Sequence, residues 1–190
     1  MPRAARRVQL LDAAARAFLE RGFDGTSMED VAHEGGVSRL IVYRIFDSKH
    51  ELYRAVLEQV NRALAHEFVG VGLDAIRSRG AARMMLPVAR AHPDAFRLLW
   101  RHAWHEPEFA DQAREFRTYV TFYAGEMLRP FIAEPVMREW AARTAGAHLV
   151  EGICNWLDAG DRDRDDELAT MLSTGLRALA AAWSDRDITN

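Results

Sequence analysis

The sequence contains a single cysteine, Cys154, and no long apolar run. A lone cysteine cannot form a disulfide within the chain, and scarce cysteine is typical of a reducing compartment, so we expect a cytoplasmic protein. No apolar stretch approaches the ~20 residues that span a bilayer. Charges at Arg16, Glu20 and Arg21 interrupt the N-terminal region, so we expect that it is not a signal peptide. We expect no association with a membrane.

Patterns typical of catalysis and of cofactor binding are also missing. The chain has no G-x-S-x-G, no phosphate-binding loop and no H-E-x-x-H. His102 and His105 lie three apart beside Glu106, but no further residue completes a metal-ligand set by its spacing. Cys154 and His148 are six apart and would lie on different faces of a helix. We therefore expect no enzyme, no metal and no cofactor.

Positive charge is too scarce for bulk binding to a polyanion, because the formal net charge is -3. Residues 1–66 carry a net charge of +1 and the remainder carries -4. The content of 49% hydrophobic and 28% charged residues is ordinary for a soluble globular protein. The length suits one large domain or two small ones. Any attraction to nucleic acid must therefore come from cations focused on one face.

The N-terminal segment shows the periodicity of an amphipathic helix over residues 7–21, which Gly22 would end. We expect this helix to support the segment that follows it. The preceding residues, 1–6, with Arg3 and Arg6, favour a loose basic arm that either reaches DNA or remains a solvated tail.

Three helix starts lie between Thr26 and Leu52. Ser27 is followed three residues later by Asp30, and Ser48 by Glu51, which is the spacing of a capping box. Ser38 precedes an apolar run and is expected to cap a second helix.

Gly35 and Gly36 lie between the first two of these helices, where a turn with positive φ is needed. A short helix, a glycine turn and a second short helix form a helix-turn-helix. Val42 and Phe46, four residues apart, share one inward face of the second helix. Other apolar residues of the motif are also expected to face inward, namely Val31, Ala32 and Val37. The opposite face could enter the DNA major groove, and it would expose Ser38, Arg39, Tyr43 and Arg44.

This stretch resembles the TetR family of bacterial transcription regulators, whose pattern is approximately T-x-x-x-(I/V)-A-x-x-(A/G)-G-V-S-x-G-x-(L/I/V)-Y-x-x-F-x-S-K-x-x-L. The resemblance extends over residues 7–55, and matching positions are Ser27, Val31, Ala32, Gly36, Val37, Ser38, Val42, Tyr43, Phe46, Ser48, Lys49 and Leu52. Where the family usually has Gly and Thr, this chain has Leu40 and Ile41. These two residues could read a thymine methyl, pack inward, or meet a partner protein.

The resemblance implies an all-α protein of about nine helices in two parts. Residues 1–47 would form a three-helix DNA-binding domain, and residues 48–190 a ligand-binding and dimerisation domain, linked by a long helix from Ser48. It further implies a ligand-responsive regulator, most simply a repressor, that binds a palindromic operator in double-stranded DNA as a homodimer through the helix at 38–46. A small-molecule effector in the C-terminal domain would release it. The DNA-binding residues would be Ser27, Ser38, Arg39, Leu40, Ile41, Tyr43, Arg44 and Lys49.

Beyond this region the helical pattern continues without strand alternation. Expected helices cover 74–91 with a break at Gly80 or Pro87, then 93–105, 107–130, 135–159 and 166–183. The tail after Ser184 is expected to fray.

Aromatic side chains gather in the middle of the chain, and the resemblance implies a largely apolar effector cavity there. Its candidate lining residues are Phe96, Trp100, Trp104, Phe116, Tyr119, Tyr123 and His148. The last two long helices carry wide apolar stripes, which in similar dimers pack as a four-helix bundle. Candidate interface residues are Leu149, Ile153, Trp156, Leu168, Leu172, Leu176 and Leu179. In both cases the same side chains could instead fill the chain's own core.

Two other classes of protein remain as alternatives. An α-helical enzyme would use the middle region, rich in histidine and aromatic residues, and would show turnover without an operator. A protein-binding adaptor with a degenerate helix-turn-helix would use Leu40 and Ile41 to bind protein, and its affinity for DNA would be weak and independent of sequence.

Overall fold

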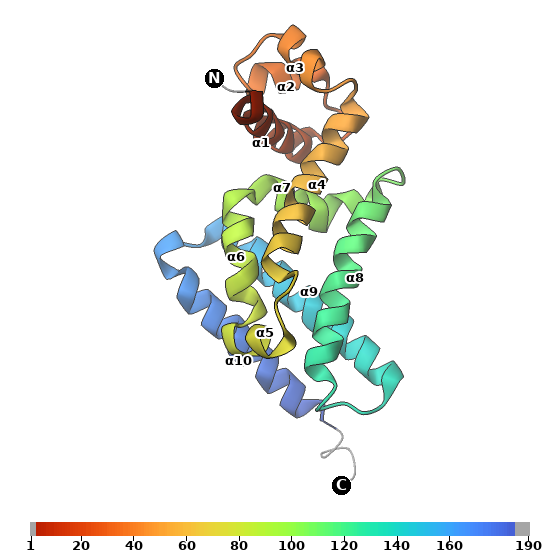
Figure 1. Ribbon diagram of the computed structural model, residues 1–190, viewed down its shortest axis with the longest axis vertical. Coiled ribbons are helices and arrows are strands. Elements are labelled where there is room, and N and C mark those ends of the chain that lie inside the picture. Colours follow the sequence, from red (N-terminus) through yellow and green to blue (C-terminus); the bar gives the residue numbers. More distant parts are fainter. Residues whose placement is uncertain (1–2, 185–190) are drawn as a thin grey trace. The chain divides into compact units, whose positions relative to one another are not determined.

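A computed structural model describes residues 3–184, which form ten α-helices and no strand (Figure 1). The expected all-α fold is confirmed. The helices are α1 (Arg3–Arg21), α2 (Met28–Glu34), α3 (Arg39–Ile45), α4 (Lys49–Phe68), α5 (Leu73–Arg79), α6 (Ala81–Ala91), α7 (Pro93–Arg97), α8 (Ala110–Leu128), α9 (Pro135–Ala159) and α10 (Asp165–Ala182). A π-helical turn (Leu98–His102) and a 3₁₀ turn (Ala103–His105) follow α7, and a second 3₁₀ turn (Arg162–Arg164) precedes α10. Within residues 3–184, no helix combines the length and the apolar character needed to cross a bilayer.

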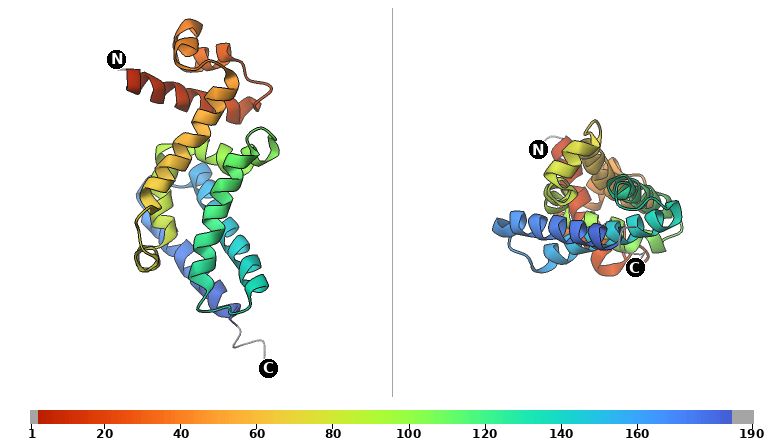
Figure 2. Two further views of the ribbon diagram at one scale, coloured as in Figure 1. Left: turned by 45° about the vertical axis from the view of Figure 1, so that its right-hand side comes forward. Right: turned by 90° about the horizontal axis from the view of Figure 1, so that it is seen from below.

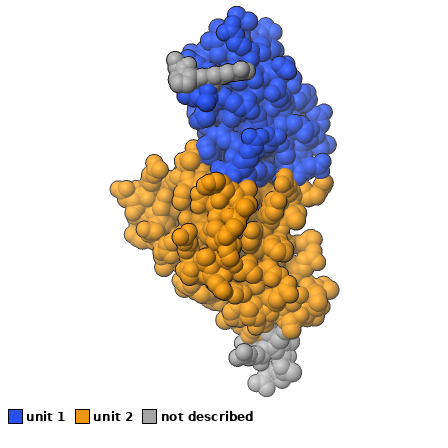
Figure 3. Space-filling model, in the orientation of Figure 1, with its two compact units in different colours: residues 1–63, 92–113 blue, residues 64–91, 114–190 orange. Residues whose placement is uncertain are grey.

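The chain divides into two compact units (Figure 3). Unit 1 comprises residues 1–63 and 92–113, and unit 2 comprises residues 64–91 and 114–190. Unit 1 thus adds most of α4, and the segment from 92 to 113, to the three helices expected for DNA binding. The functional boundary after Asp47 stays a prediction.

Unit 1 is built around an aromatic cluster that joins segments distant in the sequence. The rings of Phe18 on α1, Phe23 after it, Tyr53 on α4 and Phe109 lie 4.3 to 6.0 Å apart between centroids, mostly edge to face. Such pairs add to the gain from burial because the edge of one ring faces the electron-rich face of another. Burial disfavours the phenolate and raises the pKa of Tyr53. The cluster joins α1 to α4 through Phe18 and Tyr53, while α1 packs against α2 and α2 against α3; Figure 2 shows the backbone of these helices.

Unit 2 packs α6, α9 and α10 against one another. Gly146 on α9 lets α8 approach closely, because a Cβ there would lie 2.6 Å from Cγ1 of Val120. Farther along, Leu128, Ala142 and Ala180 belong to a small core that joins α8, α9 and α10. The small residues of α9 therefore allow two neighbouring helices to approach it.

Most helix boundaries agree with the expectations from sequence, and two differ. The helix at Pro135–Ala159 is confirmed, and Gly80, with φ of 83°, separates α5 from α6 while Pro87 remains inside α6. The loose arm is wrong for residues 3–6, which are helical, and α8 begins at Ala110 rather than at 107. The expected fraying concerns the tail after Ser184, which lies outside the described residues.

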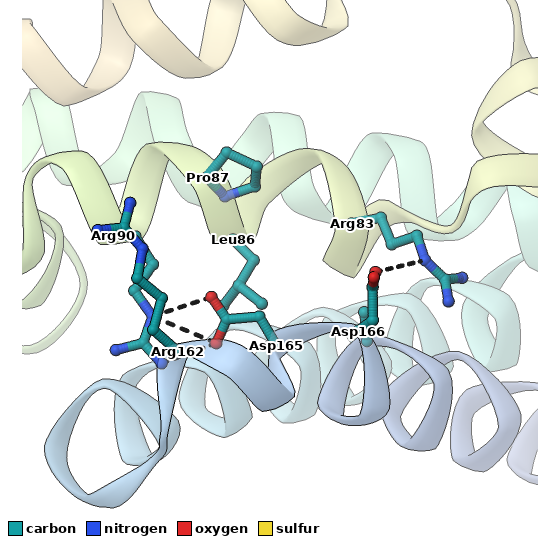
Figure 4. A pocket seen from close by; sticks show the side chains of 8 residues that line it. Arg83, Leu86, Pro87, Arg90, Arg162, Asp165 and Asp166 are labelled. Carbon is teal, nitrogen blue, oxygen red and sulfur yellow. Dashed lines mark hydrogen bonds and ion pairs between the residues drawn. The ribbon is translucent and has the colours of Figure 1, made fainter.

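An ion pair fastens the start of α10 to α6 beside a surface cavity of about 270 Å³ (Figure 4). Arg90 donates from Nε and Nη2 to the carboxylate of Asp165, at 2.7 to 3.3 Å, and Trp156 Nε1 donates to the same carboxylate at 2.7 Å. The hydrogen bonds from Arg90, and secondarily that from Trp156, hold the pKa of Asp165 below its usual value. Nearby, Arg83 pairs with the exposed Asp166 at 3.4 Å.

Replacement of Asp165 by asparagine is expected to lower the free energy of unfolding at pH 7 by about 1–3 kcal/mol, because charge-assisted hydrogen bonds are lost. Since the folded-state pKa is depressed, the wild-type carboxylate stabilises above its unfolded pKa of about 3.9, and this contribution is lost as the pH falls through the folded value. The difference in free energy of unfolding between the variant and the wild type, measured by urea unfolding, should therefore become smaller below about pH 4.

The matched control is Asp166→Asn, because the side chain of Asp166 is 92% exposed in its pair with Arg83. Exposed pairs contribute about 0–1 kcal/mol. Equal losses for both variants, or a loss at Asp165 that does not change with pH, would contradict this account.

Candidate nucleic-acid interface

The turn between α2 and α3 follows from local interactions that the sequence predicts. Ser27 Oγ accepts a hydrogen bond from Asp30 N at 3.1 Å, and Asp30 Oδ2 accepts one from Ser27 N at 2.8 Å. These reciprocal bonds complete a capping box with aspartate in the third position. Gly36 adopts φ of 61°, the left-handed conformation that the turn requires. The expected helix-turn-helix is therefore present.

The inner face of this motif is buried as expected. Val31, Val42 and Phe46 are 0% exposed, and the half-buried Val37 occupies the turn. The guanidinium of Arg7 on α1 lies 4.6 Å from the centroid of the Phe46 ring. These contacts fix the orientation of α3, so its opposite face is presented to solvent.

Leu40 and Ile41, the two aliphatic residues at the start of α3, differ in their exposure. Leu40 is 70% exposed, whereas Ile41 is half-buried and helps to seat the helix. Tyr43 and Arg44, three and four positions after Leu40, are exposed on the same side. One side of α3 therefore offers an aliphatic, a phenolic and a cationic group.

Arg39 is held by groups of its own chain. Its guanidinium forms an ion pair with the Glu29 carboxylate on α2, and it lies 5.1 Å from the centroid of the Tyr43 ring. The Tyr43 hydroxyl and then Glu29 raise the pKa of Arg39 above its usual value. The side chain remains 61% exposed, so it can exchange Glu29 for a phosphate at a modest cost.

The hydrogen bonds of Lys49 and Ser38 differ from those that their positions in the sequence predict. Lys49 Nζ donates to the Phe23 carbonyl at 2.7 Å and lies 4.3 Å from the centroid of that ring, which anchors α4 to the loop after α1. A phosphate contact by Lys49 stays a prediction and requires its release. Ser38 occupies the N-cap position of α3, but within the described residues its side chain makes no capping hydrogen bond.

Non-local contacts escaped the sequence reasoning. The Arg39–Glu29 pair and the Arg7–Phe46 contact join residues on different helices, and no spacing rule connects them. The Arg16–Glu34 pair at 2.8 Å also joins α1 to α2. Only the helix-turn-helix pattern itself predicted that α1, α2 and α3 would pack together.

The seven effector-pocket candidates do not share one environment. Phe96 and Trp100 are buried in unit 1 and Phe116 is buried in unit 2. Trp104 and Tyr119 are 46% and 55% exposed. Tyr123 is half-buried against Phe68, and His148 is exposed. The effector pocket stays a prediction.

Several predicted interface side chains are used within the chain itself. Leu149, Ile153 and Leu172 are at most 7% exposed, and a Cβ at Gly152 would lie 2.8 Å from Leu172. Trp156 packs over Gly160 besides donating to Asp165. The remaining candidates are half-buried: Leu168, Leu176 and Leu179. Part of the stripe identified from sequence thus fills the core of the chain itself, and the dimer interface stays a prediction.

Among residues 3–184, no three His, Cys, Asp or Glu side chains form a group that could hold a metal ion. Cys154 is fully buried, whereas His148 is exposed. The two residues are therefore in different environments, as their spacing suggested.

The buried inner face, the glycine turn and the exposed outer face of α3 define a helix-turn-helix protein of the DNA-binding class. The model of the family described as "Bacterial regulatory proteins, tetR family" matches residues 10–56. Over these residues the chain is similar to the TetR family, in agreement with the resemblance.

Two curated relatives and one solved structure extend this result. The transcriptional activator FasR of Mycolicibacterium smegmatis is 46% identical over 59 residues, which cover 31% of this chain and 27% of FasR. The transcriptional regulator RutR of Escherichia coli is 36% identical over 101 residues, which cover 50% of this chain and 46% of RutR. The chain thus spans less than half the length of either relative. A TetR-like regulator from a Rhodococcus species superposes with a TM-score of 0.73 at 24% identity, over 95% of this chain and 98% of that one. The chain therefore shares the fold of that solved structure, and the two curated relatives are transcriptional regulators.

Proposed function

We propose that this protein is a ligand-responsive transcriptional repressor that binds a palindromic operator as a homodimer. The observation that carries the proposal is the outer face of α3, where Leu40, Tyr43 and Arg44 are exposed above the buried Val42 and Phe46. A helix supported in this way can enter the major groove, while its exposed tyrosine and arginine reach phosphates or base edges.

A homodimer fits the surface of unit 2. Trp140 on α9 is 50% exposed and Met171 on α10 is 71% exposed, although both helices also contribute to the core of the unit. Both side chains are available to a second subunit. A two-fold dimer would place two recognition helices on half-sites about one DNA turn, ~34–36 Å, apart.

The response to a ligand would act through α4. This helix begins directly after the helix-turn-helix and continues without a break to Phe68, so its first residues lie in unit 1 and its last in unit 2. A small, largely apolar effector that prefers one orientation of α4 would shift the population away from the DNA-binding state. A strong switch needs a preference of several kcal/mol between the two states.

The test of the proposal is selection of binding sites from random DNA, followed by fluorescence anisotropy on the selected sequence and on a scrambled version. We expect a two-fold symmetric site and tighter binding to it than to the scrambled DNA. The affinity should fall steeply between roughly 50 and 200 mM salt. Each neutralised phosphate contributes about -0.9 to the slope of the logarithm of the binding constant against the logarithm of the salt concentration.

The alternatives give different results in the same experiment. A protein-binding adaptor would bind both DNA sequences weakly and equally. An enzyme would enrich no site. A reporter gene placed behind the selected site distinguishes repression from activation, because a repressor lowers expression and its effector restores it.

A further inference from the structure

Leu40 is an aliphatic side chain in an unusual place. It is 70% exposed at the second position of α3, and the neighbouring Ile41 and the buried Val42 already seat the helix. Single exposed leucines are common on protein surfaces and need no explanation by themselves. What distinguishes Leu40 is its position, since it lies between polar groups on the face that would enter the groove.

The contacts of the neighbouring residues leave Leu40 in the centre of this face. Tyr43 and Arg44 follow at three and four positions, which places them on the same side of the helix. Arg39, which precedes it, is turned onto the Glu29 carboxylate and the Tyr43 ring. In helix-turn-helix proteins the N-terminal residues of the recognition helix meet the base edges. Leu40 is therefore positioned to meet a base rather than a phosphate.

The chemistry of the side chain selects the base. Leucine has no hydrogen-bond donor or acceptor, so against adenine, guanine or cytosine it would remove water from polar groups and replace none of their hydrogen bonds. Thymine alone presents a methyl group in the major groove. We propose that Leu40 determines specificity by packing against the C5-methyl group of a thymine in each operator half-site. This inference rests on the proposed function.

The experiment uses the full-length protein and the operator selected by it. Each thymine is replaced in turn by deoxyuridine, which removes only the methyl group and keeps the base pair. At one thymine in each half-site, the wild type should lose about three- to fivefold in affinity, the amount expected for one buried methyl. In Leu40→Ala this loss should disappear, while the other thymines behave as in the wild type.

The matched control is Val8→Ala, which truncates another exposed aliphatic side chain of unit 1, on α1. It should retain the wild-type response to deoxyuridine. The inference is overturned if the wild type binds its operator selectively but no deoxyuridine weakens binding, or if the loss persists in Leu40→Ala. Binding that is indifferent to sequence would instead remove the proposed function, and this inference with it.

Discussion

Replacing Phe46 by alanine is expected to lower the free energy of unfolding of unit 1 by about 3–5 kcal/mol. The ring is 0% exposed, it follows α3 directly, and Arg7 lies 4.6 Å from its centroid. Its removal leaves a cavity between α3 and α1 that the short α3 cannot close without changing its orientation. Hydrogen exchange of α2 and α3, measured by mass spectrometry beside urea unfolding, should show the loss of protection locally.

Phe122→Ala is the matched control, because this phenylalanine is 58% exposed on α8 in unit 2. Most of its contacts are with solvent, so the change should stay within about 1 kcal/mol. Phe46→Ala should also weaken operator binding, because α3 would no longer be held in one orientation. Wild-type protection of α3 in Phe46→Ala would show that the inner face does not hold the helix.

Arg44→Ala is expected to weaken operator binding by about 10- to 100-fold, which corresponds to about 1–3 kcal/mol. Arg44 is exposed on α3, and within residues 3–184 it forms no ion pair with an acid, so its cation is available to DNA. If Arg44 reads a base edge, the variant loses selectivity at that base pair. If it contacts a phosphate, binding to all sequences weakens and the salt slope falls by about one.

The matched control is Arg62→Ala, since this exposed arginine of α4 pairs with Glu58 on its own helix. By the helical rise it lies about 20 Å further along α4 than Lys49. The Arg62→Ala variant should bind operator and scrambled DNA with the same affinities as the wild type. Equal affinities for Arg44→Ala and the wild type would mean that the outer face of α3 does not contact DNA.

Local patterns were sufficient to predict the helix-turn-helix itself. The capping box at Ser27 and the positive φ at Gly36 depend on interactions within a few residues, which sequence spacing records directly. The four-residue separation of Val42 and Phe46 predicted a shared buried face for the same reason. The start of α1 was placed too late, because the arginines of residues 3–6 favoured a basic arm although Arg and Ala are good helix formers and no stop signal precedes residue 7.

Side-chain roles that depend on distant segments could not be predicted in this way. Lys49 was expected to contact phosphate, but in this structure the Phe23 carbonyl, 26 residues earlier, accepts its hydrogen bond. Leu149 and Ile153 could lie at a dimer interface or in the chain's own core, and the structure buries both side chains within their own unit. An apolar stripe shows that a helix face is covered and does not show what covers it.

The sequence by itself determined the capped start of α2, the glycine turn before α3 and which side of α3 faces inward, because these features depend on neighbours within one or two helical turns. The tertiary structure alone decided that Arg39 lies against Glu29, that Ile41 seats the helix and that Leu40 remains exposed. These outcomes depend on how α2 and α1 pack around α3. Such packing joins residues far apart in the chain, and no local spacing encodes it.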